Sequence, residues 1–197
     1  MAITLPTSPA PRKWEPRAVS YRTNQTPVLG GPENRIGRLG TRWAVDVEIP
    51  PMRYTAAMAW LSAFSQAEDD TVLMPVHQPG FSTGAPGIPL VNGAGQLGKT
   101  LDADGLTPQH FLKDGQFFSL IHSSRRYLHL LSGHLIVDAA GEVTLAFTPM
   151  LRVSPADNAV LEIAQPMIEG FLGFSGGAPV TADQIVHGLA FTITERA

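Results

Sequence analysis

The sequence contains no cysteine, and this absence excludes several classes of chemistry at once. Disulfide bonds, thiolate nucleophiles and cysteine-ligated metal sites all require that residue. Charged residues are also scarce, at 16% of the chain, whereas soluble domains usually carry about a quarter. A chain with so little charge has apolar surface beyond what its own core uses, and contacts between subunits are a natural use for it.

Long hydrophobic runs and stripes of one charge are missing as well. No stretch approaches the roughly 18 apolar residues of a membrane span, and residues 1–14 lack the apolar centre of a signal peptide. The net charge of −3 and the lack of a Lys/Arg stripe give no electrostatic case for nucleic acid. We therefore expect neither a membrane nor a nucleic-acid partner, and folding or assembly in a cytoplasm.

What the sequence has in excess is glycine and proline. The 19 glycines and 17 prolines make up about 18% of the 197 residues, against about 12% at average usage. Because they are spread along the chain, they predict many turns between short strands and so a mostly-β fold.

Hydrophobic periodicity places the individual elements. Residues 41–49 alternate apolar and polar side chains, which predicts a half-buried strand. Ala56, Trp60 and Phe64 recur at helical spacing and predict one helix over residues 52–66, packed so that Trp43 and Trp60 are buried together. Residues 166–188 show no regular pattern, and Asp104-Gly105 and Asp114-Gly115 are hairpin-type turn signals. Further strands are expected at 71–76, 116–122, 127–131, 135–138, 142–148, 160–164 and 189–194.

Two segments are irregular. Residues 1–38 are polar and rich in proline and glycine, which fits either a disordered tail or an extended arm over residues 1–28 that docks on a partner through Trp14. Residues 78–98 hold six glycines and three prolines. A loop of this length usually marks a function or a junction between domains.

The strongest enzymatic signal is Gly93 to Thr100, GAGQLGKT, which matches the phosphate-binding pattern GxxxxGK[ST]. Such a loop must leave a buried strand and enter a helix, whose N-terminus holds the phosphates. Pro89 interrupts the preceding segment, and Gly105 and Pro108 end any following helix within two turns. We therefore expect a chance match, with nucleotide binding kept as an alternative function.

The histidines show no catalytic or metal-binding spacing. None of the six lies in an HxxxH or HExxH pattern. We expect a protein that is not an enzyme, with no cofactor and no metal site.

Two stretches together carry a resemblance to a known family. One is RLGTRWAVDVEIPPM (residues 38–52) followed by the alanine-rich helix with Trp60. The other comprises, in order, PLVNG (89–93), LKDGQFF (112–118), YLH (127–129), DAAG (138–141) and PMLR (149–152). Over roughly residues 38–197 this order resembles distal tail proteins of long-tailed, non-contractile bacteriophages and of phage-like gene transfer particles. Family members often carry Gly-Asp where this chain has Asp114-Gly115.

The resemblance implies a structural virion protein that forms a ring, sixfold to match a tail tube, at the distal end of the tail. Such a ring links the tail tube protein to the hub and the receptor-binding parts. The implied fold is a tail-tube-like β-sandwich with one packed helix, assigned to residues 29–77 plus 151–197, and an inserted β-barrel-like domain over 78–150. Localisation would be the virion tail, after assembly in the host cytoplasm.

Within such a ring, apolar side chains in the irregular segments are the expected contacts between subunits. These candidates are Trp14, Tyr21, Phe81, Ile88 and Leu90. A carbohydrate-binding β module is a further alternative, because Trp and Tyr rings stack on sugars, and fold alone does not separate these functions.

Overall fold

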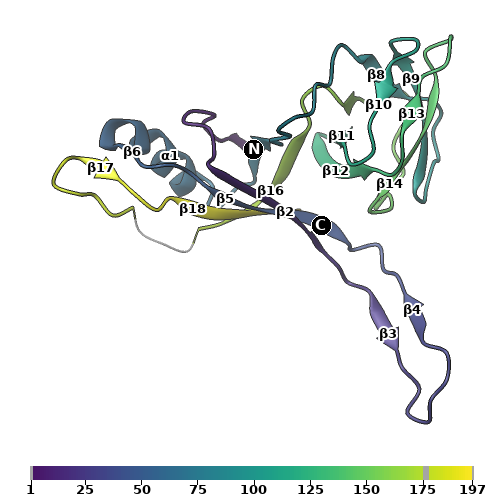
Figure 1. Cartoon of the computed structure of the whole chain (residues 1–197), viewed down its shortest axis with the longest axis horizontal. Helices are drawn as coiled ribbons and strands as arrows, with labels where there is room; N and C mark the ends of the chain where they lie inside the picture. Colours follow the sequence, from purple (N-terminus) through teal and green to yellow (C-terminus); the bar gives the residue numbers. More distant parts are fainter. Residues whose placement is uncertain (1, 175–177, 197) are drawn as a thin grey trace.

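The computed structural model describes residues 2–174 and 178–196. The chain is mostly β, with 43% strand and 7% helix, and it includes one helix and a nearly closed barrel-like sheet, which confirms the predicted fold class. Two separate clusters of buried apolar side chains give the molecule two cores. Figure 1 shows the two corresponding bodies side by side, with a long hairpin extending away from both.

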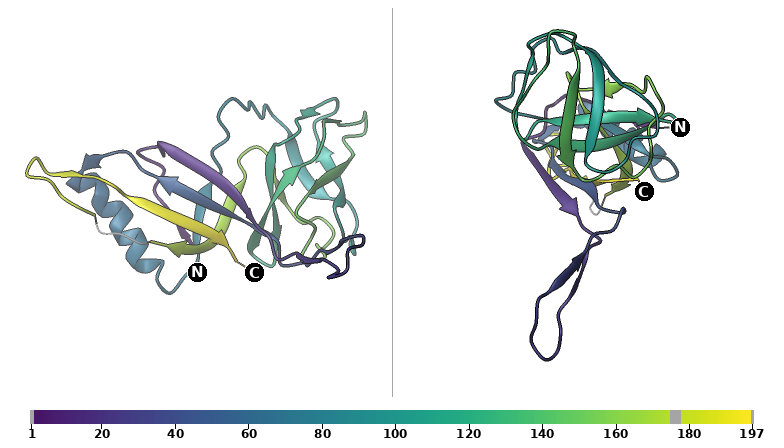
Figure 2. Two further views of the ribbon diagram at one scale, coloured as in Figure 1. Left: turned by 60° about the horizontal axis from the view of Figure 1, so that its bottom comes forward. Right: turned by 90° about the vertical axis from the view of Figure 1, so that its right-hand side faces the viewer.

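The first body, called the sheet body below, is a six-stranded sheet with the helix on one face. Only the β1–β7 pair in this sheet is parallel. Helix α1 (Tyr54–Gln66) lies against the sheet in the left view of Figure 2. The strand order is β1 (Ile3–Thr4), β7 (Val72–Pro75), β16 (Met167–Gly173), β18 (Ala190–Glu195), β5 (Arg42–Glu48) and β2 (Lys13–Val19).

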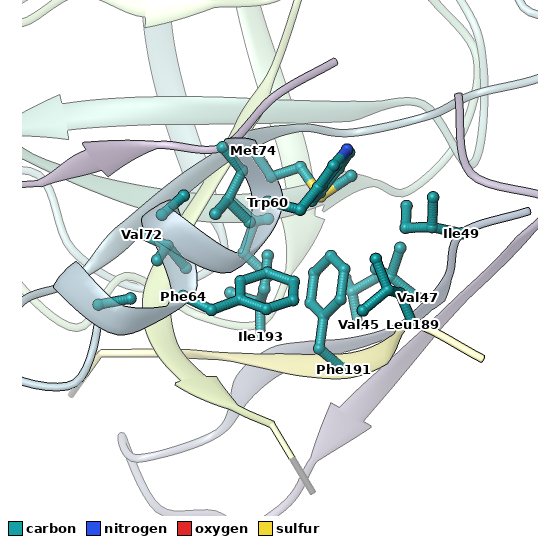
Figure 3. Close-up of a cluster of buried hydrophobic side chains, with 14 of the residues drawn as sticks. Val45, Val47, Ile49, Trp60, Phe64, Val72, Met74, Leu189, Phe191 and Ile193 are labelled. Carbon is teal, nitrogen blue, oxygen red and sulfur yellow. The ribbon is translucent and has the colours of Figure 1, made fainter. Parts of the chain in front are cut away.

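The core of the sheet body forms between the helix and the sheet (Figure 3). Trp60 and Phe64 face Phe191 of β18, with ring centroids 5.9 and 5.0 Å apart. Trp60 is fully buried, whereas Trp43 is half-buried against the same cluster and meets the ring of Phe117 edge-on at 5.1 Å. The helix forms here because its apolar residues recur on one stripe that the sheet can cover.

The second body, called the barrel, is an antiparallel six-stranded sheet that curls almost into a closed barrel (Figure 2, right). An isolated bridge between Leu90 and Val160 joins its two ends, and backbone hydrogen bonds of 2.9 Å link Val91 to Ala159 and Asn158. The strand order is β15 (Leu161–Glu162), β11 (Phe117–His122), β12 (Arg125–Leu131), β14 (Val143–Thr148), β9 (Thr100–Leu106) and β8 (Gly87–Val91).

Three small strand pairs complete the described structure. Two are β10 (Phe111–Leu112) with β13 (Leu135–Ile136), and β6 (Met52–Arg53) with β17 (Ile185–Val186). The third, β3 (Thr23–Gln25) with β4 (Asn34–Ile36), lies within the projecting segment. Residues 20–41, called the hairpin below, connect β2 to β5 and extend beyond both cores (Figure 1).

The prediction of an extended arm over residues 1–28 is wrong for its first part. β2 pairs with β5 along seven residues, Leu5 is buried in the core, and the indole of Trp60 donates to the carbonyl of Ser8 at 3.2 Å. Pro16 lacks a backbone donor, but an edge strand tolerates it because one side is not paired. The part that does project is the hairpin.

Other expected irregular regions also contain strands. Residues 166–188 include β16, which lies inside the sheet, while residues 175–177 of that range fall outside the described residues. The predicted loop 78–98 contains β8. Asp104-Gly105 lies inside β9 and is not a hairpin turn. The glycine serves an irregular pairing of β9 with β8 instead. Its φ is +69°, and a Cβ at this position would come 2.4 Å from the Ile88 carbonyl oxygen.

Candidate functional site

The segment that matches the phosphate-loop pattern connects two antiparallel strands, β8 and β9. The side chain of Gln96 closes this connection: its amide donates to the Asn92 carbonyl at 2.7 Å, and its oxygen accepts from the backbone N–H of Asp102 at 2.7 Å. The N–H of Gly93 is bonded to the carboxylate of Asp157 at 2.8 Å. A strand follows the segment, so it lacks the helix N-terminus on which phosphate binding depends.

The most buried histidine, His129, is packed as a core residue. Its ring lies 5.5 Å from that of Phe118 and 4.7 Å from that of Phe147, and Nδ1 is 2.9 Å from the Pro149 carbonyl oxygen. Burial lowers the pKa of His129 to about 3, so the ring is neutral in the folded protein. Within residues 2–174 and 178–196, no three His, Asp or Glu side chains gather as a metal site.

Several concave regions of the described surface have room for a small ligand, and two of them lie on or beside the barrel. One, of about 310 Å³, lies between the N-terminal segment and the start of the connection to the barrel, beside Phe81. The other, of about 550 Å³, is an open polar groove on the barrel beside Asp102, Asp138 and Glu142. No aromatic side chain lines the groove, so it offers no ring on which a sugar could stack.

The junction between the two bodies has the most developed polar chemistry in the molecule. Strand β12 pairs with β11 along its length but with β14 only at Leu130 and Leu131, so alternate N–H groups of its first half point to an edge without a neighbouring strand. Glutamates of the sheet body bond two of them. The N–H of Arg126 donates to Glu169 at 3.0 Å, and that of Leu128 donates to Glu195 at 2.7 Å.

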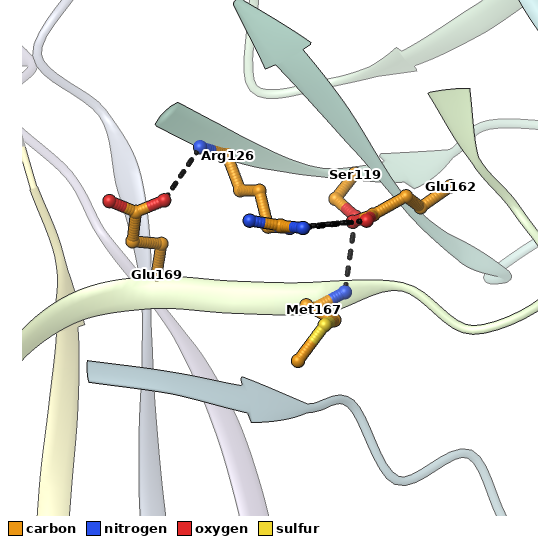
Figure 4. A network of polar contacts seen from close by, with 5 residues as sticks. All are labelled: Ser119, Arg126, Glu162, Met167 and Glu169. Atoms are coloured by element: carbon orange, nitrogen blue, oxygen red, sulfur yellow. Dashed lines mark hydrogen bonds and ion pairs between the residues drawn. The ribbon is translucent and has the colours of Figure 1, made fainter. Parts of the chain in front are cut away.

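A second set of contacts lies beside the same junction (Figure 4). The Arg126 guanidinium binds both carboxylate oxygens of Glu162, at distances from 2.9 to 3.2 Å. The hydroxyl of Ser119 donates to Glu162 at 2.7 Å and accepts from the N–H of Met167, the first residue of β16, at 3.1 Å. The bond from Met167 to Ser119 connects the barrel to the central part of the sheet, and the bonds to Glu162 hold Ser119 and Arg126 in place on the barrel side.

Glu195 is almost completely buried and is shared by both bodies. Its carboxylate accepts from the N–H of Trp43 at 3.0 Å and pairs with the guanidinium of Arg152, which lies 4.9 Å over the ring of Tyr127. Burial raises the pKa of Glu195, although Arg152 and the two backbone donors favour the charged form. Charged hydrogen bonds in so dry an environment are costly to break, so the junction holds the bodies in one orientation.

The five residues expected to contact neighbouring subunits do not form one surface. Trp14 is half-buried against the sheet core, and Leu90 is partly buried where the barrel closes. Tyr21 is exposed at the base of the hairpin, under the guanidinium of Arg42. Phe81 and Ile88 are exposed on the barrel side of the molecule. Whether any of the five contacts a partner stays a prediction.

The most exposed apolar residues, which the sequence reasoning missed, lie at the tip of the hairpin. Val28 and Leu29 are fully exposed, and Ile36 and Leu39 are exposed along its length. Their signal in the sequence is PVLGGP (residues 27–32), an apolar pair enclosed by turn-forming residues. The residues around this pair are polar or turn-forming, so the local sequence does not indicate that the pair lies at the end of a projecting element.

Comparison with known proteins does not assign the chain to a group. No protein-family model matches it, and no curated protein matches it. Among the described residues, no helix is long and apolar enough to span a membrane.

Proposed function

We propose that the chain is a structural subunit of the distal end of a long, non-contractile phage tail or of a phage-like particle. In this role copies form a ring that continues the tail tube and connects it to the hub and the receptor-binding parts. The proposal combines the resemblance of residues 38–197 to distal tail proteins with a structure in which two bodies are held in a fixed orientation.

The observation that carries the proposal is the junction. Glu169 and Glu195 bond the free edge of a barrel strand, and the ion pair of Glu195 with Arg152 is buried. A flexible linker would let two bodies move independently, whereas these bonds fix them. A connector that must transmit position from a tube to a hub needs such a fixed geometry.

The chemistry of the remaining surface also favours a structural role over a catalytic one. The loop at Gly93–Thr100 is closed by its own Gln96 side chain, and its Gly93 donor is already bonded to Asp157. His129, which is fully buried between two phenylalanine rings, has no access to a substrate. The most exposed apolar side chains, Val28 and Leu29, instead lie at the tip of the hairpin, which suits contact with another protein.

The test is to locate the protein in particles made by a strain that carries its gene. Gold-labelled antibody raised against the purified protein should mark the distal end of the tail in electron micrographs. Deletion of the gene should give tails that lack their end structure, and a copy supplied in trans should restore it. Particles that carry no label, or complete tails made without the gene, would contradict the proposal.

A further inference from the structure

We propose that the hairpin of one copy docks on the sheet body or barrel of a second copy, with Val28 and Leu29 buried at its tip and its arginines facing acidic side chains of the receiving surface. The inference rests on the proposed structural role and deepens it, because it names the element and the type of contact through which copies associate.

The hairpin is poorly stabilised by its own contacts. Its ladder consists of three residue pairs, Thr23–Ile36, Asn24–Arg35 and Gln25–Asn34, and every residue of β3 and β4 is exposed. A two-stranded hairpin without a covered face is at best marginally stable in water. A partner surface that covers one face would supply the missing stabilisation.

The tip adds a specific reason for docking. Val28 and Leu29 are adjacent in the turn between β3 and β4, and both side chains are fully exposed. Burying two such side chains in a partner surface is favourable because it removes their apolar surface from water. Single exposed apolar residues are common, but an apolar pair at the end of a projecting element is suited to inserting into a partner.

Charge identifies the partner as a second copy. Residues 20–41 contain Arg22, Arg35, Arg38 and one acidic residue, Glu33, for a net charge of +2. The whole chain carries −3, so the other residues together carry −5. The hairpin is therefore complementary in charge to the remainder of its own chain, and such complementarity favours encounter between the two.

The same charges decide the geometry of the contact. Pairing two hairpins with each other would bring arginines of both copies together, which is repulsive. Binding of the hairpin to a different surface of the next copy is a heterologous contact, and repeated heterologous contacts close into a ring when the rotation between copies permits. Each copy would then donate one hairpin and receive one.

The experiment measures self-association of the purified full chain by sedimentation velocity from ~1 to ~100 μM. The wild type should form a discrete oligomer. The tip variant V28S/L29S and the charge variant Arg38→Glu should each weaken association at least tenfold. The matched controls are Leu97→Ser and Lys99→Glu, which make the same kinds of change at exposed positions of the barrel and should associate like the wild type.

A shortened variant tests the direction of the contact. Replacing residues 20–41 by Asn-Gly, a turn suited to two paired strands, leaves a copy that can receive a hairpin but cannot donate one. Mixed with the wild type, it should cap growing assemblies and reduce their size. Hydrogen exchange should also show that residues 20–41 of the wild type become protected as the concentration rises.

The inference would be overturned by a wild type that stays monomeric, by hairpin variants that associate like the wild type, or by a shortened copy that joins rings of normal size. It would also be overturned if the hairpin bound another tail component and hairpin variants left self-association unchanged. None of these results bears on whether the protein is located at the tail end, which the antibody labelling decides separately.

Discussion

At the residue scale, burial strongly perturbs the chemistry of His129. It is enclosed by Phe118 and Phe147, and only Nδ1 has a hydrogen-bond partner among the described residues. The hydrogen bond from Nδ1–H to the Pro149 carbonyl fixes the orientation of the ring in the core. The free-energy cost of burying the ring appears in the dependence of stability on pH.

Burial lowers the pKa of His129 to about 3, against 6.5 for the unperturbed side chain. The unfolded chain therefore binds a proton that the folded protein excludes, and stability falls as the pH drops below 6.5. At pH 5 this loss is about 2 kcal/mol, since each pH unit corresponds to about 1.36 kcal/mol. Urea unfolding of wild type and His129→Leu at pH 7.5 and pH 5 measures it. The wild type should lose about 2 kcal/mol more than the variant, and equal losses would show that His129 becomes protonated without unfolding.

A second prediction at this scale concerns the turn between β11 and β12. Ser123 and Ser124 have φ of 50° and 60°, which defines a two-residue turn with both residues in the left-handed region. Asn-Gly is the preferred pair for such a turn. Replacing Ser123-Ser124 by Asn-Gly should stabilise the protein by about 1 kcal/mol, a rise in melting temperature of about 2–4 °C for a chain of this size. An unchanged or lower melting temperature in calorimetry would mean that the serines make contacts worth as much as the strain.

At the scale of elements, strand β12 shows how one body completes another. Its free edge is bonded by the side chains of Glu169 and Glu195 in place of a neighbouring strand. A buried N–H left without an acceptor costs about 1–3 kcal/mol, so these carboxylates are part of the structure of the barrel as well as of the junction.

Glu169→Ala should therefore lower the free energy of unfolding by about 1–3 kcal/mol. Glu169→Gln keeps an acceptor oxygen and should lose less. Chemical denaturation measures both, with Glu142→Ala as the matched control, because Glu142 is an exposed carboxylate on the barrel. If Glu169→Ala and Glu142→Ala unfold at the same urea concentration, the carboxylate does not hold the strand edge.

The sequence predicts some elements well because one rule governs them. β5 and α1 each bury one regular stripe of apolar residues, and both were expected from periodicity. β16 does not follow this pattern. Its Glu169 is buried, where it accepts a hydrogen bond from the backbone of β12, and its Phe171 is exposed. Gly170 is required by tertiary contact, because a Cβ there would come 2.2 Å from the Thr194 carbonyl oxygen. Such constraints come from partners distant in the chain, and local patterns do not reveal them.

The candidate contact surface shows the same limit. Trp14 was expected to project, but it packs on the sheet because the strand that carries it pairs with β5. Val28 and Leu29 are exposed because neither core lies near the end of the hairpin. The composition alone identifies residues 1–38 as polar and rich in proline. The division of this segment into an edge strand and a hairpin depends on pairing with residues distant in the chain.

At the scale of the whole molecule, a buried junction joins two bodies, and a hairpin projects beyond them. In the role that we propose, they act as one subunit with a docking element. This account leaves no role for the exposed lysine of the phosphate-loop-like segment. Lys99→Ala should therefore leave the melting temperature and self-association unchanged, and titration calorimetry should detect no ATP or GTP binding by the wild type. Micromolar nucleotide affinity that disappears in Lys99→Ala would refute this prediction and revive the alternative function.

The central claim is that the chain forms a ring at the distal end of a tail, and electron cryo-microscopy of intact particles tests it most directly. The account predicts a ring of density at the tail end in which each repeat accommodates the sheet body and the barrel in the orientation fixed by Glu169, Glu195 and Arg152, with the hairpin lying on the adjacent copy. A tail end whose density accommodates neither body, in particles that mass spectrometry shows to lack the protein, would contradict it.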